Sequence, residues 1–182
     1  MKAIVAVDSN WGIGINGELL CKIPEDMKRF KAKTINNVVI MGRRTFESFP
    51  NNEPLKDRVN IVLTKYPHIQ PIHTGHVLIY PSIEHLMFNL RTFENIDNIY
   101  VIGGQTIYEQ LLPYCSEVFI TKILANFPAD KHFPNLDIHK NWAMTEMSDY
   151  HYYQSTNAII GKIYYRFTTY TNKDIKDIKE II

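Results

Sequence analysis

Short, mostly apolar runs alternate with helix-compatible segments through the first two thirds of the chain. Apolar runs of four or five residues are typical of strands buried on both faces of a parallel sheet. They lie at residues 3–7, 38–41, 59–63, 76–79, 99–102 and 118–121. Helices are predicted between them over residues 24–30, 43–48, 83–90 and 105–112. Pro24 suits a first helical position, Ser82 an N-cap and Pro113 a stop.

The pattern changes after residue 121. Residues 145–153 and 159–170 are two long, aromatic segments of β type joined by the polar residues 154–157, which is typical of an antiparallel hairpin. The sequence therefore predicts one α/β domain over residues 1–170. Its mixed, mostly parallel twisted sheet of about eight strands is flanked by helices on both faces and finished by the C-terminal hairpin. The tail, residues 171–182, could form a short helix; docking on its own domain, pairing with a second subunit and fraying are all open.

The composition is that of an ordinary folded protein, with 45% hydrophobic and 21% charged residues among 182. A net charge of +1 leaves no broad basic field to attract nucleic acid or a membrane surface. No apolar run reaches the roughly 18 residues of a membrane span. Cys21 and Cys115 form no CxxC pair, which argues against a disulfide framework and suits a cytoplasmic location. The seven histidines lack metal-binding spacing, so we expect no metal site.

A glycine-rich segment follows the first expected strand. Residues 12–17, GIGING, have the G-x-G-x-x-G spacing of a dinucleotide-binding turn. In that motif the last glycine leads directly into a helix whose N-terminus faces the pyrophosphate, whereas here residues 18–23 separate Gly17 from Pro24. The spacing therefore predicts a long loop between a buried strand and an acidic helix, of the kind that moves or binds a ligand.

Cationic, hydroxyl and glycine residues follow three other expected strands. Ligands of a parallel sheet bind outside the carboxyl ends of its strands, so the residues after each strand are candidates for a site. They are Gly42, Arg43, Arg44 and Thr45, then Thr64 and Lys65, then Gly103, Gly104, Gln105 and Thr106. Each group alone is typical of a tight turn or a solvated helix start. Together they favour a cradle for a phosphorylated cofactor.

Asp26 is the candidate for acid–base chemistry. A carboxylate in the first turn of a helix is usually explained by the helix dipole alone. Asp26, however, lies four residues before Phe30 and beside Met27, so it shares a helix face with apolar side chains. An acid on such a wall should be desolvated, with a raised pKa and a preference for cationic hydrogen-bond donors. The amino and ring N–H groups of a flat heterocycle would suit it.

Five motifs in this order resemble the dihydrofolate reductases over nearly the whole chain. The first combines IVAV (residues 4–7), GIGING (12–17), IPED (23–26) and FK (30–31). The others are VIMGRRTFES (39–48), RVNIVLT (58–64), VIGGQTIY (101–108) and HFP (132–134). The resemblance implies the fold of that family and hydride transfer from NADPH to the pterin ring of dihydrofolate, which gives tetrahydrofolate.

The resemblance also implies a role for each matching residue on the substrate side. Asp26 would be the catalytic residue, hydrogen-bonded to pterin nitrogens and assisting protonation, with support from Thr121. Arg58 would pair with the glutamate carboxylate of the substrate. The pterin pocket and the wall around the substrate's aromatic part would be formed by Ile4, Val5, Ala6, Met27, Phe30, Phe49, Leu55, Ile102 and Tyr108.

On the cofactor side the resemblance implies a lid and a phosphate cradle. The lid would close over the nicotinamide and exclude water, and its residues include Ile13, Gly14, Gly17, Glu18 and Leu19. The adenine side of the cofactor and its phosphates would be bound by Gly42, Arg43, Arg44, Thr45, Leu63, Thr64 and Lys65. The pyrophosphate and nicotinamide region would contact Ala6, Ile102, Gly103, Gly104, Gln105, Thr106, Ile107 and Tyr108.

Two positions depart from the family pattern. Leu20 and Cys21 stand where many members have Pro-Trp, whose tryptophan helps to organise water near the pterin. We expect Cys21 to fill space rather than to act as a nucleophile. Gln105 and Thr106 stand where some relatives carry an arginine for the extra phosphate of the cofactor. The preference for NADPH would then depend on Arg43, Arg44, Thr64 and Lys65.

Two alternatives share several of these features. A reductase of riboflavin synthesis has the same fold and a nicotinamide cofactor, but it needs phosphate-binding groups where Asp26, Phe30 and Arg58 lie. A non-catalytic nucleotide-binding module would keep the glycines and arginines without needing Asp26. We expect the protein to be a monomer rather than a dimer. We also expect it to bind dihydrofolate and antifolate inhibitors, but neither nucleic acid nor a membrane.

Overall fold

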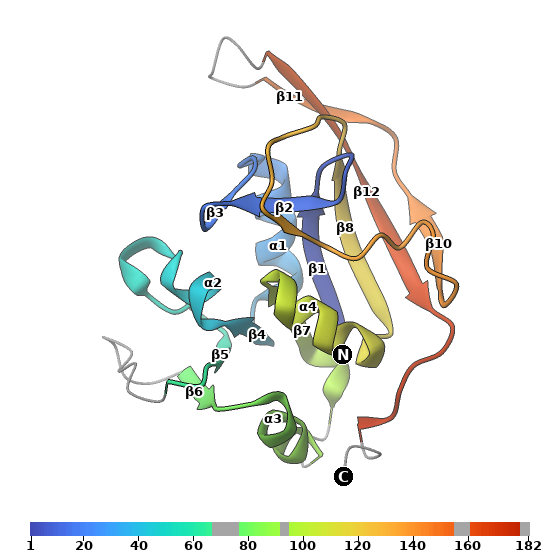
Figure 1. Cartoon of the computed structure of the whole chain (residues 1–182). Coiled ribbons are helices and arrows are strands. Elements are labelled where there is room, and N and C mark those ends of the chain that lie inside the picture. The colour runs from blue at the N-terminus through green and yellow to red at the C-terminus, as the bar shows by residue number, and fades with distance from the viewer. Residues whose placement is uncertain (67–76, 92–94, 155–160, 179–182) are drawn as a thin grey trace.

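A mixed sheet of nine strands forms the centre of the protein (Figure 1). The computed structural model describes residues 1–66, 77–91, 95–154 and 161–178. Within them the strands of this sheet are β1 (Lys2–Val7), β4 (Val38–Gly42), β5 (Val59–Leu63), β6 (Val77–Tyr80), β7 (Ile99–Gly103), β8 (Glu117–Ile123), β10 (Trp142–Met147), β11 (His151–Gln154) and β12 (Lys162–Asn172). The helices are α1 (Pro24–Thr34), α2 (Arg43–Glu47), α3 (Ile83–Leu90) and α4 (Gln105–Leu111), with 3₁₀ turns at Pro50–Asn52, Ile96–Asn98 and Leu112–Tyr114.

The strand order is β10-β12-β8-β1-β7-β4-β5-β6, and β11 also pairs with β12. The strands from β8 to β6 are parallel, whereas β12 is antiparallel to β8, β10 and β11. This confirms the mixed, mostly parallel sheet with an antiparallel C-terminal end. The carboxyl ends of β1, β4, β5 and β7 lie at one edge of the sheet, where a parallel sheet binds its ligands.

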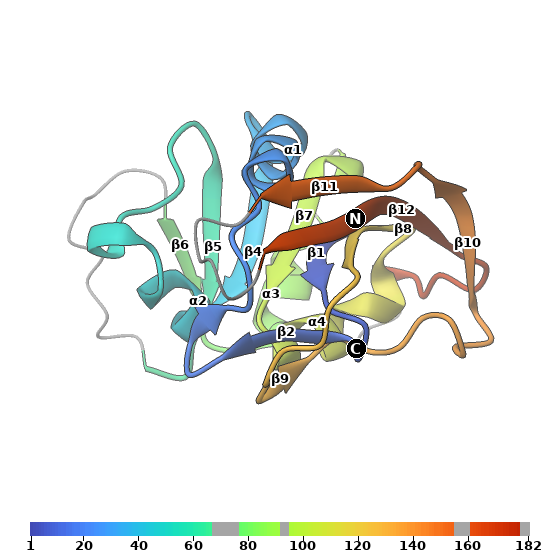
Figure 2. The ribbon, with the colours of Figure 1, turned by 90° about the horizontal axis from the view of Figure 1, so that it is seen from above.

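Helices cover both faces of the sheet, α1 on one and α3 with α4 on the other (Figure 2). Successive side chains of a strand point to opposite faces. In β1, accordingly, Val5 packs with α3 and α4, and Ile4 packs with Phe30 of α1. Both faces are apolar because both are covered, which is why the strands are continuous apolar runs.

Two buried clusters follow from this division. The larger one, on the α3 and α4 face, includes residues of all the central strands. The other, here called the α1-side cluster, consists of Ile4, Val39, Met41, Phe46, Val62, Tyr100 and Phe119, with Phe30, Phe49, Leu55, Val77 and Ile102 packed against it. No helix in the described ranges has the length and apolar character needed to cross a membrane.

The glycine-rich segment is not the long loop that the spacing predicted. It forms β2 (Gly12–Ile15), which pairs with β3 (Glu18–Leu19) and with β9 (Lys131–His132) in a separate antiparallel sheet. Asn16 and Gly17 connect β2 to β3 with φ of 52° and 85°. Positive φ at both central residues is typical of a type I′ turn, for which Asn-Gly is the favoured sequence.

The C-terminal hairpin also differs in detail from the prediction. The predicted segment 145–153 is two strands, β10 and β11, because the chain leaves the ladder between them, where Ser148 Oγ accepts from the Phe167 N–H at 3.0 Å. The predicted turn lies mostly at residues 155–157, outside the described residues. The helix predicted to residue 112 ends at Leu111, and Pro113 lies inside the following 3₁₀ turn. Strand β6 spans Val77–Tyr80, and His76 lies outside the described residues.

In the tail, residues 173–177 are irregular and Ile178 has 3₁₀ conformation, while the remaining residues lie outside the described ones, so the short helix stays a prediction. Strand β12 continues to Asn172, beyond the end predicted for the domain. Ile178 is 5% exposed and packs in the larger buried cluster. Burial of this isoleucine holds the described part of the tail on the domain.

Candidate active site

Helix α1 and strand β8 bring together an acid and a hydroxyl. Pro24 begins the helix, and Asp26 lies in its first turn. Asp26 is 8% exposed, and its Oδ1 accepts a hydrogen bond of 2.5 Å from Oγ1 of Thr121 on β8. The two residues are 95 positions apart. They meet because β8 lies next to β1, under the helix that follows β1.

Burial controls the charge state of Asp26. It raises the pKa of the carboxyl above its ordinary value, and this effect outweighs the opposing effects of the Thr121 hydrogen bond and the charge of Arg29. The predicted desolvation of this acid is thus confirmed. A carboxyl with a raised pKa keeps its proton to a higher pH than an exposed aspartate, which suits it to acid–base chemistry.

An apolar wall extends from Asp26 along α1. Ile4, Phe30, Phe49, Leu55 and Ile102, all predicted for the substrate side, belong to or pack against the α1-side cluster. Three other predicted residues are not part of that cluster. Ala6 packs beside Cys21 in a neighbouring cluster, Met27 is 39% exposed, and the Val5 side chain packs in the core of the opposite face. Val5 can therefore face this wall only through its backbone.

Arg58 lies at the far end of the wall and is held in a fixed orientation. It is 8% exposed, its Nε donates to Thr34 Oγ1 at 2.8 Å, and its Nη1 donates to the Lys56 carbonyl at 2.7 Å. Among the described residues, no hydrogen bond occupies Nη2. Arg58 and Leu55 line an open cleft of about 1010 Å³ with Asn36, Lys56 and Asn98. Leu55 is the residue that this cleft shares with the wall.

The predicted glycine cradle is tightly packed. A Cβ at Gly42 would lie 3.1 Å from Ile107, and one at Gly104 would lie 3.4 Å from Thr45 Oγ1, so the starts of α2 and α4 are neighbours. Gly42 and Gly104 are the N-caps of these helices and supply no side-chain acceptor. Backbone N–H groups at both helix starts are therefore left without a side-chain cap.

Gly103 connects the cradle to the wall through Tyr108. The peptide bond between Gly103 and Gly104 is cis, and Gly103 has a φ of 111°. A Cβ there would lie 2.8 Å from the Tyr108 ring. The Tyr108 hydroxyl donates to the Ile4 carbonyl at 2.7 Å, so the same tyrosine contacts the turn after β7 and the central strand.

Cationic side chains lie at the ends of β4 and β5. Arg43 forms an ion pair of 3.2 Å with Glu47 and lies 5.4 Å from the centre of the Tyr66 ring, so the start of α2 is close to the segment after β5. Arg44 and Lys65 are exposed. Two other predicted residues of this region are buried, Leu63 in the larger cluster and Thr64, whose Oγ1 accepts from the Tyr66 N–H at 3.1 Å.

The predicted lid residues lie beside α4 on the three-stranded sheet β3-β2-β9, here called the small sheet. Ile13 is half-buried against the larger cluster, whereas Gly17, Glu18 and Leu19 are exposed. Gly14 packs closely, since a Cβ there would lie 2.8 Å from the Glu18 carbonyl oxygen. Gln105 Oε1 accepts from the His132 N–H at 2.9 Å, which connects α4 to β9, while Thr106 is exposed.

Of three polar residues near the site, Asp8 could be expected from its place directly after the first strand, whereas Thr34 and Arg29 could not. Asp8 is 2% exposed, and its carboxylate accepts from the N–H groups of Asn10, Gly12 and Phe127 at 2.8–2.9 Å, so it holds the turn before β2. The bonds from Asn10 and Gly12 are short-range and typical of aspartate in turns. Thr34 and Arg29 give no such indication, because their contacts with Arg58 and with the Phe167 ring depend on the folded arrangement. Among the described residues, no cluster of three or more His, Cys, Asp or Glu side chains could hold a metal ion.

Comparison with known proteins identifies this arrangement. The family model described as dihydrofolate reductase matches residues 1–172. The chain belongs to the dihydrofolate reductase family. It is 38% identical over 141 residues to the dihydrofolate reductase of Drosophila melanogaster, covering 72% of this chain and 77% of that one. It is 33% identical to the dihydrofolate reductase of Bacillus subtilis, with 94% of each chain covered.

A solved structure agrees with the fold. Dihydrofolate reductase from Enterococcus faecalis, complexed with NADP(H) and RAB-propyl, matches with a TM-score of 0.77 and 31% identity over 95% of this chain and 96% of that chain. The predicted family and fold are thereby confirmed, and so are the enzyme class, NADPH as the cofactor and dihydrofolate reduction as the reaction. Neither the pyrimidine reductase nor the non-catalytic module is favoured.

Proposed function

We propose that the wall between Asp26 and Arg58 is the dihydrofolate site of this dihydrofolate reductase. The observation that carries the proposal is the position of a buried carboxyl at one end of an apolar wall and an oriented guanidinium at the other. A folate has matching parts in the same order. Its pterin carries amino and ring N–H donors, its middle is an aromatic ring, and its end is a glutamate carboxylate.

Each part of the substrate has a chemically suited partner. The pterin N–H groups donate to Asp26, while Ile4, Ala6, Ile102 and the Val5 backbone surround the ring. Met27, Phe30, Phe49 and Leu55 contact the aromatic part. Arg58 binds the glutamate carboxylate, and Nη2, which no bond within the described residues occupies, is suited to it. Thr121 keeps Asp26 in place, and Tyr108 fixes the strand that carries Ile4.

The residues of the cradle fit NADPH. Glycines at positions 42, 103 and 104 let Ile107, Tyr108 and Thr45 pack closely against the starts of α2 and α4, and the uncapped N–H groups of these helices suit phosphate oxygens. Arg43, Arg44 and Lys65 supply positive charge for the adenine-side phosphates, together with the Thr45 and Thr64 hydroxyls. Gln105, Thr106, Ile107 and Tyr108 continue this surface toward the substrate. When bound, NADPH supplies the hydride.

Side chains of the protein control delivery of the proton that the reaction consumes. Reduction of the pterin C=N bond requires one hydride at carbon and one proton at nitrogen, so each turnover consumes one proton. Asp26, whose pKa burial raises, assists delivery of that proton and keeps the pterin oriented through hydrogen bonds. The small sheet, with Ile13, Gly14, Gly17, Glu18 and Leu19, covers the nicotinamide side and excludes water.

We infer the metabolic role, location and partners of the protein from the same features. A dihydrofolate reductase supplies tetrahydrofolate to one-carbon metabolism and is a target of antifolates, which would occupy the pterin pocket. Cys21 and Cys115 are free thiols, which supports a reducing, cytoplasmic location. A net charge of +1 supports the absence of nucleic acid and anionic membrane as partners. We propose a monomer.

Asp26→Asn tests the proposed role directly. Loss of an acid–base group should lower kcat by about 10²- to 10⁴-fold, and the residual rate should rise as the pH falls, because protons from solvent replace the missing donor. The assay is dihydrofolate-dependent oxidation of NADPH, run in parallel with NADH. Glu25→Gln is the matched control, since it removes an exposed carboxylate from the same helix turn. Undiminished turnover in Asp26→Asn would refute the role of Asp26.

A further inference from the structure

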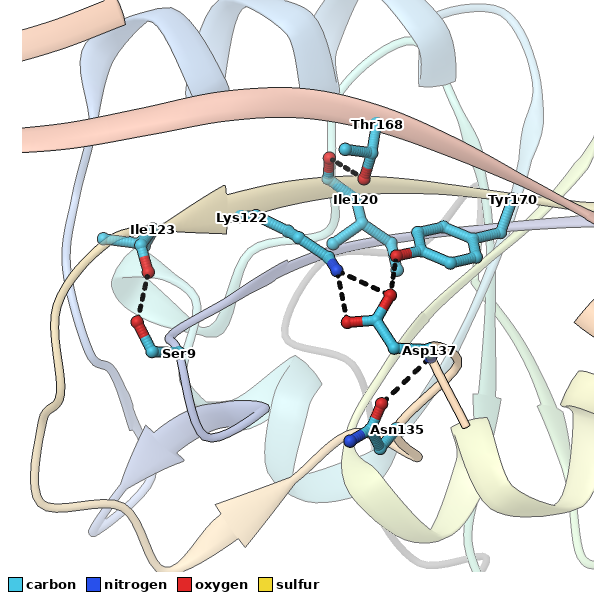
Figure 3. Close-up of polar contacts among 8 residues, drawn as sticks. All are labelled: Ser9, Ile120, Lys122, Ile123, Asn135, Asp137, Thr168 and Tyr170. Atoms are coloured by element: carbon cyan, nitrogen blue, oxygen red, sulfur yellow. Dashed lines mark hydrogen bonds and ion pairs between the residues drawn. The ribbon is translucent and has the colours of Figure 1, made fainter. Parts of the chain in front are cut away.

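A polar and aromatic group lies on the opposite side of β8 from Asp26. Lys122 follows Thr121 on this strand, so its side chain points to the other face of the sheet. Its Nζ donates to both carboxylate oxygens of Asp137, at 2.9 and 2.7 Å. The Tyr170 hydroxyl of β12 donates to the same carboxylate (Figure 3). We call Lys122, Asp137, Tyr170 and Trp11 the Asp137 cluster.

Trp11 places this cluster against the small sheet. The indole is 7% exposed, and Lys122 Nζ lies 4.8 Å from its ring centre. The Tyr170 ring meets it edge-on at 6.3 Å. An ammonium over the face of a tryptophan is attracted by the ring. Lys122 therefore contacts Trp11 and Asp137 together, and its side chain is only 16% exposed.

The backbone of Trp11 leads directly into β2. Trp11 has a φ of 63°, a conformation that a bulky residue adopts only when its surroundings hold it. Its carbonyl accepts from the Phe133 N–H at 2.8 Å, immediately after β9, and the two rings are stacked at 6.3 Å. Trp11 and Phe133 thus flank the pairing of β2 with β9, and their orientation fixes where the small sheet lies.

A second contact connects the same residues to the cofactor side. The Phe133 ring meets the Tyr108 ring edge-on at 4.8 Å, and Tyr108 packs under Gly103 and donates to the Ile4 carbonyl. A contiguous set of packed residues therefore runs from Asp137, through Lys122 and Trp11, to Phe133 and Tyr108. Ser9 adds a bond from the start of this turn to β8, since its Oγ donates to the Ile123 carbonyl at 3.4 Å (Figure 3).

We propose that Lys122 is a positioning residue for NADPH, which acts by holding Trp11, and with it the small sheet, over the nicotinamide side of the site. Lys122 touches neither ligand. Its effect passes through Trp11 and Phe133, and the inference rests on the proposed function of the small sheet as the cover of the cofactor. Asp137 and Tyr170 fix Lys122 in turn. One strand thus supports the acid through Thr121 on one face and the cofactor cover through Lys122 on the other.

The test compares Lys122→Met with Lys2→Met. Both substitutions remove a partly buried lysine from an ion pair, since Lys2 Nζ lies 3.1 Å from Glu117 on a neighbouring part of the sheet. Lys122→Met should raise the Kd and KM for NADPH about tenfold, while kcat and the KM for dihydrofolate change less than about twofold. Lys2→Met should leave the NADPH constants unchanged, and Lys122→Arg should restore them.

Fluorescence supplies a readout that a general loss of stability would not change. In a Trp142→Phe background Trp11 is the sole tryptophan of the chain. Lys122→Met should shift its emission to the red and increase its quenching by acrylamide, whereas Lys2→Met should do neither. Asp137→Asn provides a second variant, with smaller effects in the same direction, if Lys122→Met does not fold.

Equal NADPH constants in Lys122→Met and Lys2→Met would overturn the proposal and leave the cluster a purely structural feature. An unchanged Trp11 emission would overturn it as well. Wild-type protein that binds NADPH without reducing dihydrofolate would instead refute the proposed dihydrofolate site, and the comparison of Kd values by calorimetry would still decide the positioning role.

Discussion

At the scale of single residues, burial of Asp26 connects activity to stability. Because burial raises its pKa, the folded state holds the proton more tightly than the unfolded chain, whose aspartate pKa is about 3.9. The stabilising contribution of Asp26 is therefore complete below that ordinary value and is lost as the pH rises through the raised value. Above it, folding must bury an ionised carboxylate.

Asp26→Asn should consequently be more stable than the wild type at neutral pH and no more stable near pH 4. The asparagine carries no charge and still accepts the Thr121 hydrogen bond. Urea unfolding of both proteins at a series of pH values measures the difference. Glu25→Gln serves as the reference, because its exposed side chain loses little water on folding. A gain in stability that does not depend on pH would contradict the argument.

Thr34 gives a second prediction at this scale. Thr34→Val removes the acceptor of the Arg58 Nε hydrogen bond and leaves a buried donor without a partner, at a cost of about 1–3 kcal/mol. We expect a several-fold higher KM for dihydrofolate, with little change in kcat, because the guanidinium is no longer held in orientation. Thr34→Ser keeps the hydroxyl and should behave as the wild type. An unchanged KM in Thr34→Val would show that Arg58 needs no such support.

At the scale of elements, the sequence was informative where a pattern is local. The parallel strands and helices α1, α3 and α4 could be predicted from apolar runs, Pro24 and Ser82. The β2–β3 hairpin was missed although Asn16-Gly17 favours one, because the G-x-G-x-x-G spacing indicated a loop. The pairing of β2 with β9 could not be predicted at all, since residues such as Gly14 and Lys131 meet only in the folded chain.

Two glycines separate the cost of an unfavourable backbone conformation from the cost of a packing overlap near the cradle. Gly17 and Gly103 both have positive φ, but only Gly103 is packed against another side chain. Gly17→Ala should cost about 1–2 kcal/mol of stability from its backbone conformation. Gly103→Ala should cost about 1–3 kcal/mol more, because its Cβ would overlap the Tyr108 ring, and it should weaken NADPH binding. Thermal unfolding and NADPH titration compare the two. Equal losses in both variants would show that the contact with Tyr108 is relieved cheaply.

At the scale of the whole molecule, the tail belongs to the core that the strands form. Ile178→Ala should destabilise the protein by about 2–5 kcal/mol, as expected for truncating a buried isoleucine. Ile175→Ala, at a position 51% exposed, should change stability by less than about 0.5 kcal/mol. Urea unfolding measures both. If the two variants are equally stable, the tail contributes nothing and the domain ends near residue 170 as predicted.

The candidate site is predictable only in part at this scale. Asp26 could be proposed from its own helix, and the glycines and arginines from the strand ends. The apolar wall depends on which face each side chain takes, and the Val5 side chain packs on the opposite face, so only its backbone can line the site. Thr34, which orients Arg58 from 24 residues away, has no local pattern that marks it.

The central position of β1 has a consequence for the time course of synthesis. This strand precedes both of its neighbours, β7 and β8, in the chain, and Lys2 lies opposite Tyr100 and Glu117. At the usual rate of translation, roughly 5–20 residues per second, about a hundred residues take roughly 5–20 s to follow. During that interval the apolar β1 segment has neither of the strands with which it pairs in the folded sheet. Completion of the sheet, and with it of the folate and nucleotide sites, must therefore wait until β7 and β8 have been synthesised.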